Sequence, residues 1–225
     1  MSLTELSPSA QNYLKVVWGL QEWSDAPVTP STIAAKAGVK LSTASGAVSK
    51  LTEQGLLDHS PYGAVTLTER GRRYAVAMVR RHRLIETFLV QMLGYTWDQV
   101  HDEAEHLEHA VSDFLIERID DLLGRPTRDP HGDPIPAADG SINAPLAVPL
   151  SAAVPGERVV VERIDDADPQ LLQHFADRGV LVGAVLRVGQ PEPYSEALEV
   201  TVAEGGQLSL GRAAAASVWV SSGDA

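Results

Sequence analysis

Apolar residues in the first third of the chain recur at spacings of three and four, which is typical of amphipathic helices. Each run follows a Ser or Thr, residues that cap helices well, and the first two have proline at the first helical position. The pattern predicts three helices: residues 8–23 after Ser7, residues 30–37 after Thr29, and Ser42–Gln54 with Ser42 as the cap. Two helices joined by a tight, glycine-containing turn are typical of a helix-turn-helix.

The next stretch changes from a helical period to alternation. Residues 56–68 alternate on either side of a Pro-Tyr-Gly turn, which predicts a β-hairpin directly after the third helix. A hairpin in this position is a wing, so residues 1–70 are interpreted as a winged helix-turn-helix that binds DNA. The alternative is a small helical domain with an ordinary hairpin and no DNA, because winged folds also serve protein contacts.

Longer helices and then short strands are expected beyond the wing. The periodicity predicts a helix over residues 69–93, capped by Thr68, and two more over residues 97–109 and 111–123, whose apolar faces favour dimerisation. Residues 124–155 are rich in Pro, Gly and Asp and predict a linker, with an ordered first half as one possibility. Five strand-like runs with one helix, over residues 169–178, then predict a small SH3-like β-barrel.

Cysteine is absent from the 225 residues, which excludes disulfide scaffolds, zinc ribbons and thiolate metal ligands. Any bound metal must therefore use His, Asp, Glu, Asn or backbone oxygen. The chain begins without a basic segment followed by an apolar one, and no apolar run reaches the length of a membrane span. We therefore expect a soluble, cytoplasmic protein without a membrane partner.

The net charge of −12 argues at first against nucleic-acid binding, because a nucleic-acid-binding protein neutralises phosphates with Lys and Arg. The charge is unevenly distributed, however. Residues 1–97 hold ten basic and seven acidic side chains, which leaves eight basic and 23 acidic ones for the remainder. A mildly basic N-terminal part, residues 1–97, is thus joined to a strongly acidic remainder, and the interpretation that the winged domain binds DNA stands.

One segment concentrates metal-binding side chains. At about 100° per residue, His101, Glu105, Glu108 and His109 fall on one face of a single helix. On the preceding helix, His82 and Glu86 are four residues apart and point the same way. A solvated acidic face is the ordinary alternative for such a run, but two imidazoles and two carboxylates together favour a cation between them. Imidazole and carboxylate without thiolate suit manganese, ferrous iron, cobalt or zinc.

Three motifs together resemble a known family: RRHRLIE at 80–86, HDEAEHLEH at 101–109 and DPHGDPIP at 129–136. With the winged helix, they resemble the diphtheria-toxin-repressor family of metal-dependent transcriptional regulators, and among these the manganese-responsive branch of actinobacteria. The fold class implied is mainly α with small β parts. Its expected domains are a winged helix-turn-helix at 1–70, a helical dimerisation and metal-binding domain at 71–140, a linker at 141–155 and an SH3-like (FeoA-like) domain at 156–225.

The resemblance implies two metal sites per subunit. His82, Glu86 and His101 match the ancillary site, which a side chain of the C-terminal domain completes; the candidates are Asp165, Asp166, Asp168 and Gln170. The primary site is expected to use Glu105, Glu108 and His109 with a ligand from the first helix. That ligand is Asp or Met in most relatives and Asn12 here, so we expect either weaker metal binding at the primary site than an Asp would give, or a rearranged site.

Metal choice and DNA contacts follow from the same resemblance. Iron-type relatives have a cysteine where this chain has Glu105, and a hard carboxylate favours Mn²⁺, with Fe²⁺ as the alternative. The third helix is expected to enter the major groove of operator DNA. The candidate DNA-binding residues are Lys40, Ser42, Thr43, Ser45, Ser49 and Lys50, with Tyr62 in the wing.

The function expected is a homodimeric, manganese-dependent repressor that controls manganese uptake genes, and not an enzyme. An iron(II)-dependent repressor of the same architecture is the nearest alternative. A metallohydrolase would need an open coordination position and a substrate pocket, which nothing in the sequence marks. A barrel that binds a protein or peptide partner is compatible with the repressor interpretation.

Overall fold

The computed structural model describes residues 3–60, 63–190, 197–203 and 206–223. The chain forms two compact units: Met1–His82 with Pro136–Ser141, and Arg83–Ile135 with Ile142–Ala225. Helix α4 (Glu69–Leu93) is one continuous helix that belongs to both. None of the helices in the described part of the chain combines the length and apolar character needed to cross a membrane.

The first unit holds the helix-turn-helix. Its described elements, after a short 3₁₀ turn η1 (Leu3–Glu5), are α1 (Pro8–Glu22), α2 (Pro30–Lys36), α3 (Leu41–Glu53), β1 (Leu57–His59) and β2 (Val65–Leu67). Ser7 and Thr29 cap α1 and α2 through their side chains, as predicted. Leu14, Val17, Ile33, Val48 and Leu51 are buried in its core.

Helix α3 begins one residue earlier than its sequence predicts. Lys40 is the N-cap residue, without a side-chain hydrogen bond, and Ser42 lies inside the first turn. The prediction of Ser42 as the cap was therefore wrong. The Ala37–Lys40 turn ends early enough for Leu41 to take helical geometry, so the start of α3 follows from the turn and not from a capping side chain.

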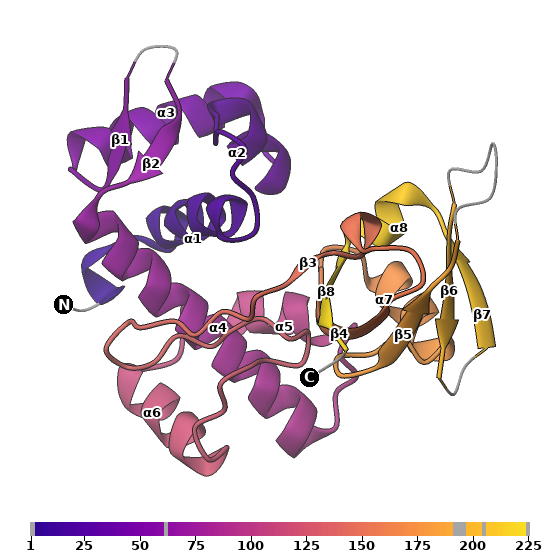
Figure 1. Cartoon of the computed structure of the whole chain (residues 1–225). Coiled ribbons are helices and arrows are strands. Elements are labelled where there is room, and N and C mark those ends of the chain that lie inside the picture. Colours follow the sequence, from indigo (N-terminus) through magenta and orange to yellow (C-terminus); the bar gives the residue numbers. More distant parts are fainter. Residues whose placement is uncertain (1–2, 61–62, 191–196, 204–205, 224–225) are drawn as a thin grey trace. The chain divides into compact units, whose positions relative to one another are not determined.

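The hairpin lies directly after α3, as the alternation predicts (Figure 1). Its strands are antiparallel, with Leu57 opposite Leu67. Thr68 accepts a hydrogen bond from the Gly71 amide and so opens α4. A Cβ at Gly71 would lie 1.9 Å from the Leu56 carbonyl oxygen, so only glycine allows the helix to pass this close to the strand.

Two shorter helices pack with the C-terminal half of α4 in the second unit. They are α5 (Val100–Leu107) and α6 (Asp113–Leu122), each shorter than the predicted 97–109 and 111–123. The predicted helices included Glu108 and His109, which instead form the C-cap and a turn, and Ser112 caps α6 through its side chain. The buried residues shared by these helices are Leu84, Ile85, Leu89, Val100, Ala104, Ile116 and Ile119.

A six-stranded antiparallel sheet completes the second unit (Figure 1). Its order is β3-β8-β4-β5-β6-β7, from β3 (Val148–Pro149), β8 (Val218–Ser222), β4 (Arg158–Ile164), β5 (Val185–Val188), β6 (Leu198–Val202) and β7 (Gly206–Leu210). The turn η2 (Leu150–Ala152) and the helices α7 (Pro169–Asp177) and α8 (Arg212–Ala216) accompany it. Helix α8 was not predicted, and β3 pairs with β8 although residues 141–155 were expected to be linker.

The Pro/Gly/Asp-rich segment over residues 127–135 is ordered. Asp129 Oδ1 accepts hydrogen bonds from the amides of His131 and Asp133, both at 2.9 Å. A Cβ on Gly132 would lie 2.0 Å from the Glu162 carbonyl oxygen, and the Ile164 amide donates to the His131 carbonyl. This segment, hereafter the 127–135 loop, therefore packs directly against strand β4.

Candidate metal centre

Glu86 lies at the centre of the ligand-bearing side chains of the second unit. It belongs to α4 and is 1% exposed. Its neighbours Leu84, Ile85 and Leu89 are buried in the helical core, so the carboxylate has no access to water. A buried carboxylate is tolerated only with partners that offset its charge, and two groups of side chains approach it.

The first group comes from α5 and from the segment after β4. His101 Nδ1 lies 2.8 Å from Asp166 Oδ2 and 3.4 Å from Glu86 Oε1. His82 precedes Glu86 by one turn of α4, so the two side chains share a helix face. Of the candidates from the C-terminal domain, the structure brings Asp166 to this group.

Asp165 and Asp168 are engaged elsewhere. Asp165 Oδ1 accepts from the Ala167 amide, and Asp168 Oδ1 caps α7 by accepting from the amides of Gln170 and Leu171. A carboxylate that caps a helix is held away from a ligand position by its own hydrogen bonds. Position 166 thus differs from its neighbours in facing the imidazole of His101.

The second group comes from the 127–135 loop, and sequence reasoning missed it. This group consists of Glu86, Asp129 and His131, all of them buried. Each offers one ligand atom, and these three atoms lie within 4.8 Å of one another. The His131 ring stacks on Trp97 with centroids 5.9 Å apart, and its Nε2 lies 2.7 Å from the Trp97 carbonyl oxygen. Nδ1 is buried and has no hydrogen-bond partner in the part of the chain that the structure describes.

The Trp97 contact fixes the ring of His131. A carbonyl oxygen only accepts, so Nε2 carries a hydrogen, and in the neutral ring Nδ1 keeps its lone pair. Metal-ligating histidines commonly have their second nitrogen oriented by such a carbonyl. The signal in the sequence was present: His131 and Asp129 stand two residues apart in the DPHGDPIP motif, which a Pro/Gly-rich turn can fold onto one site.

The electrostatics of the group show an excess of negative charge. Burial lowers the pKa of His101, but its hydrogen bonds to Asp166 and Glu86 outweigh this and raise it to about 11. Burial, with the charges of Asp133 and Glu86, raises the pKa of Asp129 well above its ordinary value. The pKa of His131, which burial lowers, is raised overall by Glu86, Asp129 and Asp166. Bound protons thus offset carboxylates that a divalent cation could offset instead.

A second set of candidate ligands lies at the end of α5. Glu108 is fully buried, and its Oε1 lies 3.6 Å from His109 Nε2. Glu105 Oε1 lies 3.8 Å from His101 Nε2, so the two candidate sites are neighbours along one helix. His106 faces away: it is exposed and its Nδ1 lies 2.7 Å from the Asp102 carbonyl oxygen.

The remaining candidate ligand, Asn12, lies on α1 in the first unit. Its side chain is half-buried, and Oδ1 is buried with no hydrogen-bond partner among the described residues. A buried amide oxygen without a partner costs free energy, which an oxygen-seeking cation would recover. The buried oxygen of Asn12 fits a hard divalent cation, and the buried Nδ1 of His131 fits a divalent transition metal.

A buried ionic network holds the 127–135 loop against the sheet. Arg163 Nε on β4 lies 2.6 Å from Asp133 Oδ1, and its guanidinium stacks 4.3 Å from the centroid of Trp219. Arg83 on α4 lies 3.4 Å from Asp133 Oδ1 and 3.6 Å from Asp129 Oδ2. Asp133 thus joins a helix of the second unit to its sheet, two residues from His131.

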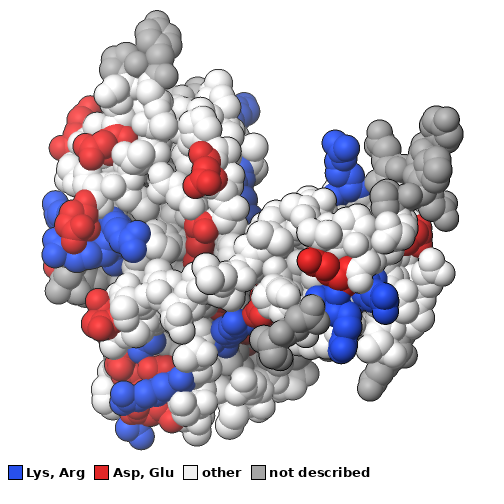
Figure 2. Space-filling view, viewed as in Figure 1, with Lys and Arg blue, Asp and Glu red and all other residues white. Residues whose placement is uncertain are grey.

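The predicted DNA-binding side chains are on the surface. Lys40 and the α3 residues Ser42, Thr43, Ser45, Ser49 and Lys50 are exposed, and Tyr62 lies outside the described residues. On the face drawn in Figure 2, acidic and basic side chains are interspersed among uncharged ones, so the charge of −12 does not form a continuous acidic face in that view.

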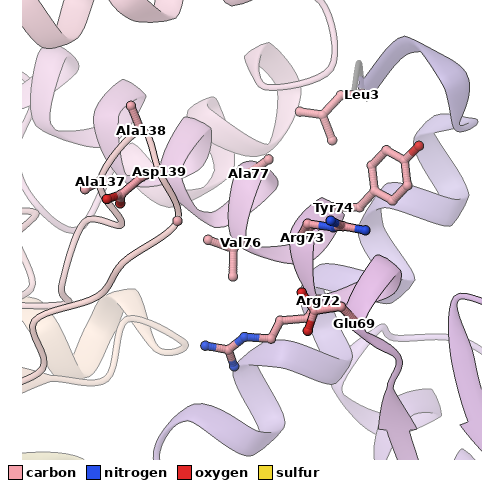
Figure 3. Close-up of a pocket in the computed structure, with 11 residues that line it drawn as sticks. Leu3, Glu69, Arg72, Arg73, Tyr74, Val76, Ala77, Ala137, Ala138 and Asp139 are labelled. Carbon is pink, nitrogen blue, oxygen red and sulfur yellow. The ribbon is translucent and has the colours of Figure 1, made fainter.

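A cavity of about 370 Å³ in the first unit is separate from these ligands. It lies between α4 and residues 137–140 and is lined by Arg72, Arg73, Tyr74, Val76 and Asp139 among others (Figure 3). Its lining mixes apolar groups with charges of both signs and contains no histidine. It offers no arrangement of ligands for a metal, and we assign it no role.

Three protein-family models match consecutive segments of this chain. Residues 5–65 match the family described as the N-terminal DNA binding domain of iron dependent repressors, residues 68–137 its metal binding and dimerisation domain, and residues 148–222 the FeoA domain. The iron-dependent repressor IdeR of Mycobacterium tuberculosis is 31% identical over 201 residues, 83% of this chain and 86% of IdeR. The chain belongs to the diphtheria-toxin-repressor family.

IdeR is named for iron, and other similar proteins are named for a toxin or for manganese. The diphtheria toxin repressor of Corynebacterium diphtheriae is 33% identical over 159 residues, 70% of this chain and 68% of that protein. A solved structure titled "Manganese-dependent transcriptional repressor complex with manganese" is 54% identical, with a TM-score of 0.90, and covers 95% of this chain and 99% of that one. Like its relatives, the chain is a metal-dependent transcriptional repressor of the diphtheria-toxin-repressor type, a class of regulators and not of enzymes.

Proposed function

We propose that this chain is a manganese-dependent repressor that binds operator DNA as a metal-activated dimer. The observation that carries the proposal is the ligand set: buried carboxylates, imidazoles and an amide oxygen, without thiolate or thioether. Carboxylate and carbonyl oxygen suit Mn²⁺, whereas softer ligands select other ions. The 54% identity to a protein titled manganese-dependent supports the same choice, and the iron-named relatives keep Fe²⁺ as the alternative.

Two metal sites per subunit are proposed. His82, Glu86, His101 and Asp166 would hold one ion, with Asp129 and His131, which also group with Glu86, as additional candidate ligands. Glu105, Glu108 and His109 would hold the second, with Asn12 of α1 as the further ligand that the family pattern implies. The bound ions would supply the positive charge that these carboxylates lack. We propose the domain limits 1–70, 71–140 and 156–225, with β3 at 148–149 belonging to the sheet although it precedes 156.

The operator is proposed to be read by two copies of α3. Its exposed Ser, Thr and Lys side chains suit phosphates and thymine methyl groups, and they offer few bidentate base contacts. Because a dimer reads two half-sites at a fixed spacing, metal binding that changes the distance between the recognition helices would change the affinity for the operator. Genes for manganese uptake are the proposed targets.

The decisive experiment selects genomic DNA fragments with the metal-free protein, with and without Mn²⁺, and with Fe²⁺ under anaerobic conditions. We expect Mn²⁺ to produce tight and sequence-selective binding that exceeds the Fe²⁺ effect. A larger effect of Fe²⁺ would instead support an iron(II)-dependent repressor. Binding that is indifferent to both metals would overturn the switch altogether.

Proton release is expected when the metal binds, because the ligand histidine is protonated without it. The pKa of His101 is raised from 6.5 to about 11, so His101 must lose its proton to become a ligand, and Mn²⁺ affinity should rise with pH. The same shift stabilises the metal-free fold: the contribution is complete below pH 6.5 and is lost as the pH rises through about 11.

Titration calorimetry in buffers of different ionisation enthalpy measures the protons released per Mn²⁺ bound. The variant His101→Gln should release fewer protons than the wild type. Equal proton release by both proteins would show that His101 is not the group that titrates.

A further inference from the structure

Helix α1 carries a second polar side chain near Asn12. Lys15 is three residues further along and therefore lies on the same face of the helix. It is half-buried, and its Nζ lies 3.4 Å from Nδ1 of His82 on α4, within the first unit. His82 itself is only 7% exposed. This face of α1 thus carries one neutral amide and one cation.

The contact between Lys15 and His82 has a fixed direction. An ammonium group has three donors and no acceptor, so His82 Nδ1 must accept with its lone pair. A neutral imidazole has one such lone pair, because the other nitrogen carries the hydrogen. The lone pair held by Lys15 is therefore the one that His82 would give to a metal.

Coordination through the other nitrogen would remove the contact as well. If Nε2 bound the metal, the hydrogen would move to Nδ1, and an N–H group would then face the donors of the ammonium. Binding of Lys15 and binding of a metal by His82 therefore exclude each other, whichever nitrogen is the ligand.

We propose that Lys15 is an internal cation that competes with the metal for His82. This inference rests on the proposed function, because it assumes that His82 is a ligand. In the metal-free protein the ammonium holds His82, and Mn²⁺ must displace it. Lys15 then keeps its charge and extends its long side chain towards solvent. Lys15 and the neutral Asn12 give the metal site no negative charge from α1. Repression therefore requires a higher Mn²⁺ concentration than it would if either residue were acidic.

The variant Lys15→Met tests the proposal, because it keeps the length of the side chain and removes the ammonium. Mn²⁺ binding to the metal-free protein without DNA, measured from the EPR signal of free Mn²⁺, should tighten by about 10-fold, the order expected for one partly screened charge. Lys15→Arg keeps the charge and should stay within about 2-fold of the wild type. Lys36→Met removes an equal charge from the exposed face of α2 and should also stay within about 2-fold.

A second readout needs no Mn²⁺. In the metal-free protein, the ¹⁵N resonance of His82 Nδ1 should shift in Lys15→Met and stay unchanged in Lys36→Met. Thermal unfolding of each variant shows whether it folds.

Unchanged Mn²⁺ affinity in Lys15→Met, or equal tightening in Lys36→Met, would overturn the proposal. So would an unshifted His82 resonance. Failure of the proposed function looks different: the wild type would then bind no Mn²⁺ in the same titration, or would bind it without gaining affinity for DNA.

Discussion

Replacing Glu108 by Gln is expected to abolish manganese-dependent operator binding. Glu108 is fully buried, and its Oε1 lies 3.6 Å from His109 Nε2, so the substitution removes one negative charge from the centre of the proposed primary site without changing its shape. Loss of an outer-shell partner already costs about 10–100-fold in metal affinity, so loss of a ligand should cost about 100-fold or more. Mn²⁺ titration of the metal-free variant and operator binding at fixed Mn²⁺ measure the two effects.

The matched control is Glu103→Gln, the same chemical change at a half-exposed position of α5. It should retain wild-type Mn²⁺ affinity. Glu108→Gln should also keep the thermal stability of the metal-free protein, because a buried charge has been removed. Normal Mn²⁺ affinity in Glu108→Gln, or a loss that merely follows unfolding, would contradict the assignment of Glu108 as a ligand.

Replacing Phe114 by Asp is expected to convert the protein to monomers and to eliminate operator binding. Phe114 is 76% exposed on α6, and Leu115 and Leu122 on the same helix are 45% and 59% exposed. Exposed apolar residues that cluster on one helix are typical of an interface. A central aromatic residue of an interface contributes about 2–4 kcal/mol to association, and a buried Asp would add a desolvation cost.

Sedimentation of the metal-loaded protein measures the change. The control Leu146→Asp replaces an even more exposed apolar residue, at 97%, outside the helices. It should remain a dimer. Dimeric Phe114→Asp, or monomers in both variants, would show that α6 does not form the interface.

The sequence predicted the elements whose side chains repeat with a helical period or alternate along a strand. His101, Glu105 and Glu108 could be placed on one face because the helical period fixes their angles. The winged helix-turn-helix could be predicted because Ser7 and Thr29 cap the first two helices and a glycine follows the second and the third. The same logic misplaced the start of α3, since the Ala37–Lys40 turn sets it and Ser42 does not.

Contacts between distant segments could not be predicted in this way. Asp165, Asp166 and Asp168 are equivalent by composition, and only the path of the chain after β4 brings Asp166 to His101. His131 was missed for the same reason. The 127–135 loop has no period, and its shape depends on hydrogen bonds to Asp129 and on the close passage of Gly132 over β4.

The Asp133 bridge between Arg83 and Arg163 also determines where this repressor can be divided. Cutting the chain before the sheet would remove Arg163 and with it one ion pair of Asp133, and loss of one partner from a buried ion pair costs about 3–5 kcal/mol. The loop that carries Asp129 and His131 would lose its support in β4 at the same time. Removing the sheet would therefore also disturb the proposed metal ligands, because β4 supports the loop that carries Asp129 and His131.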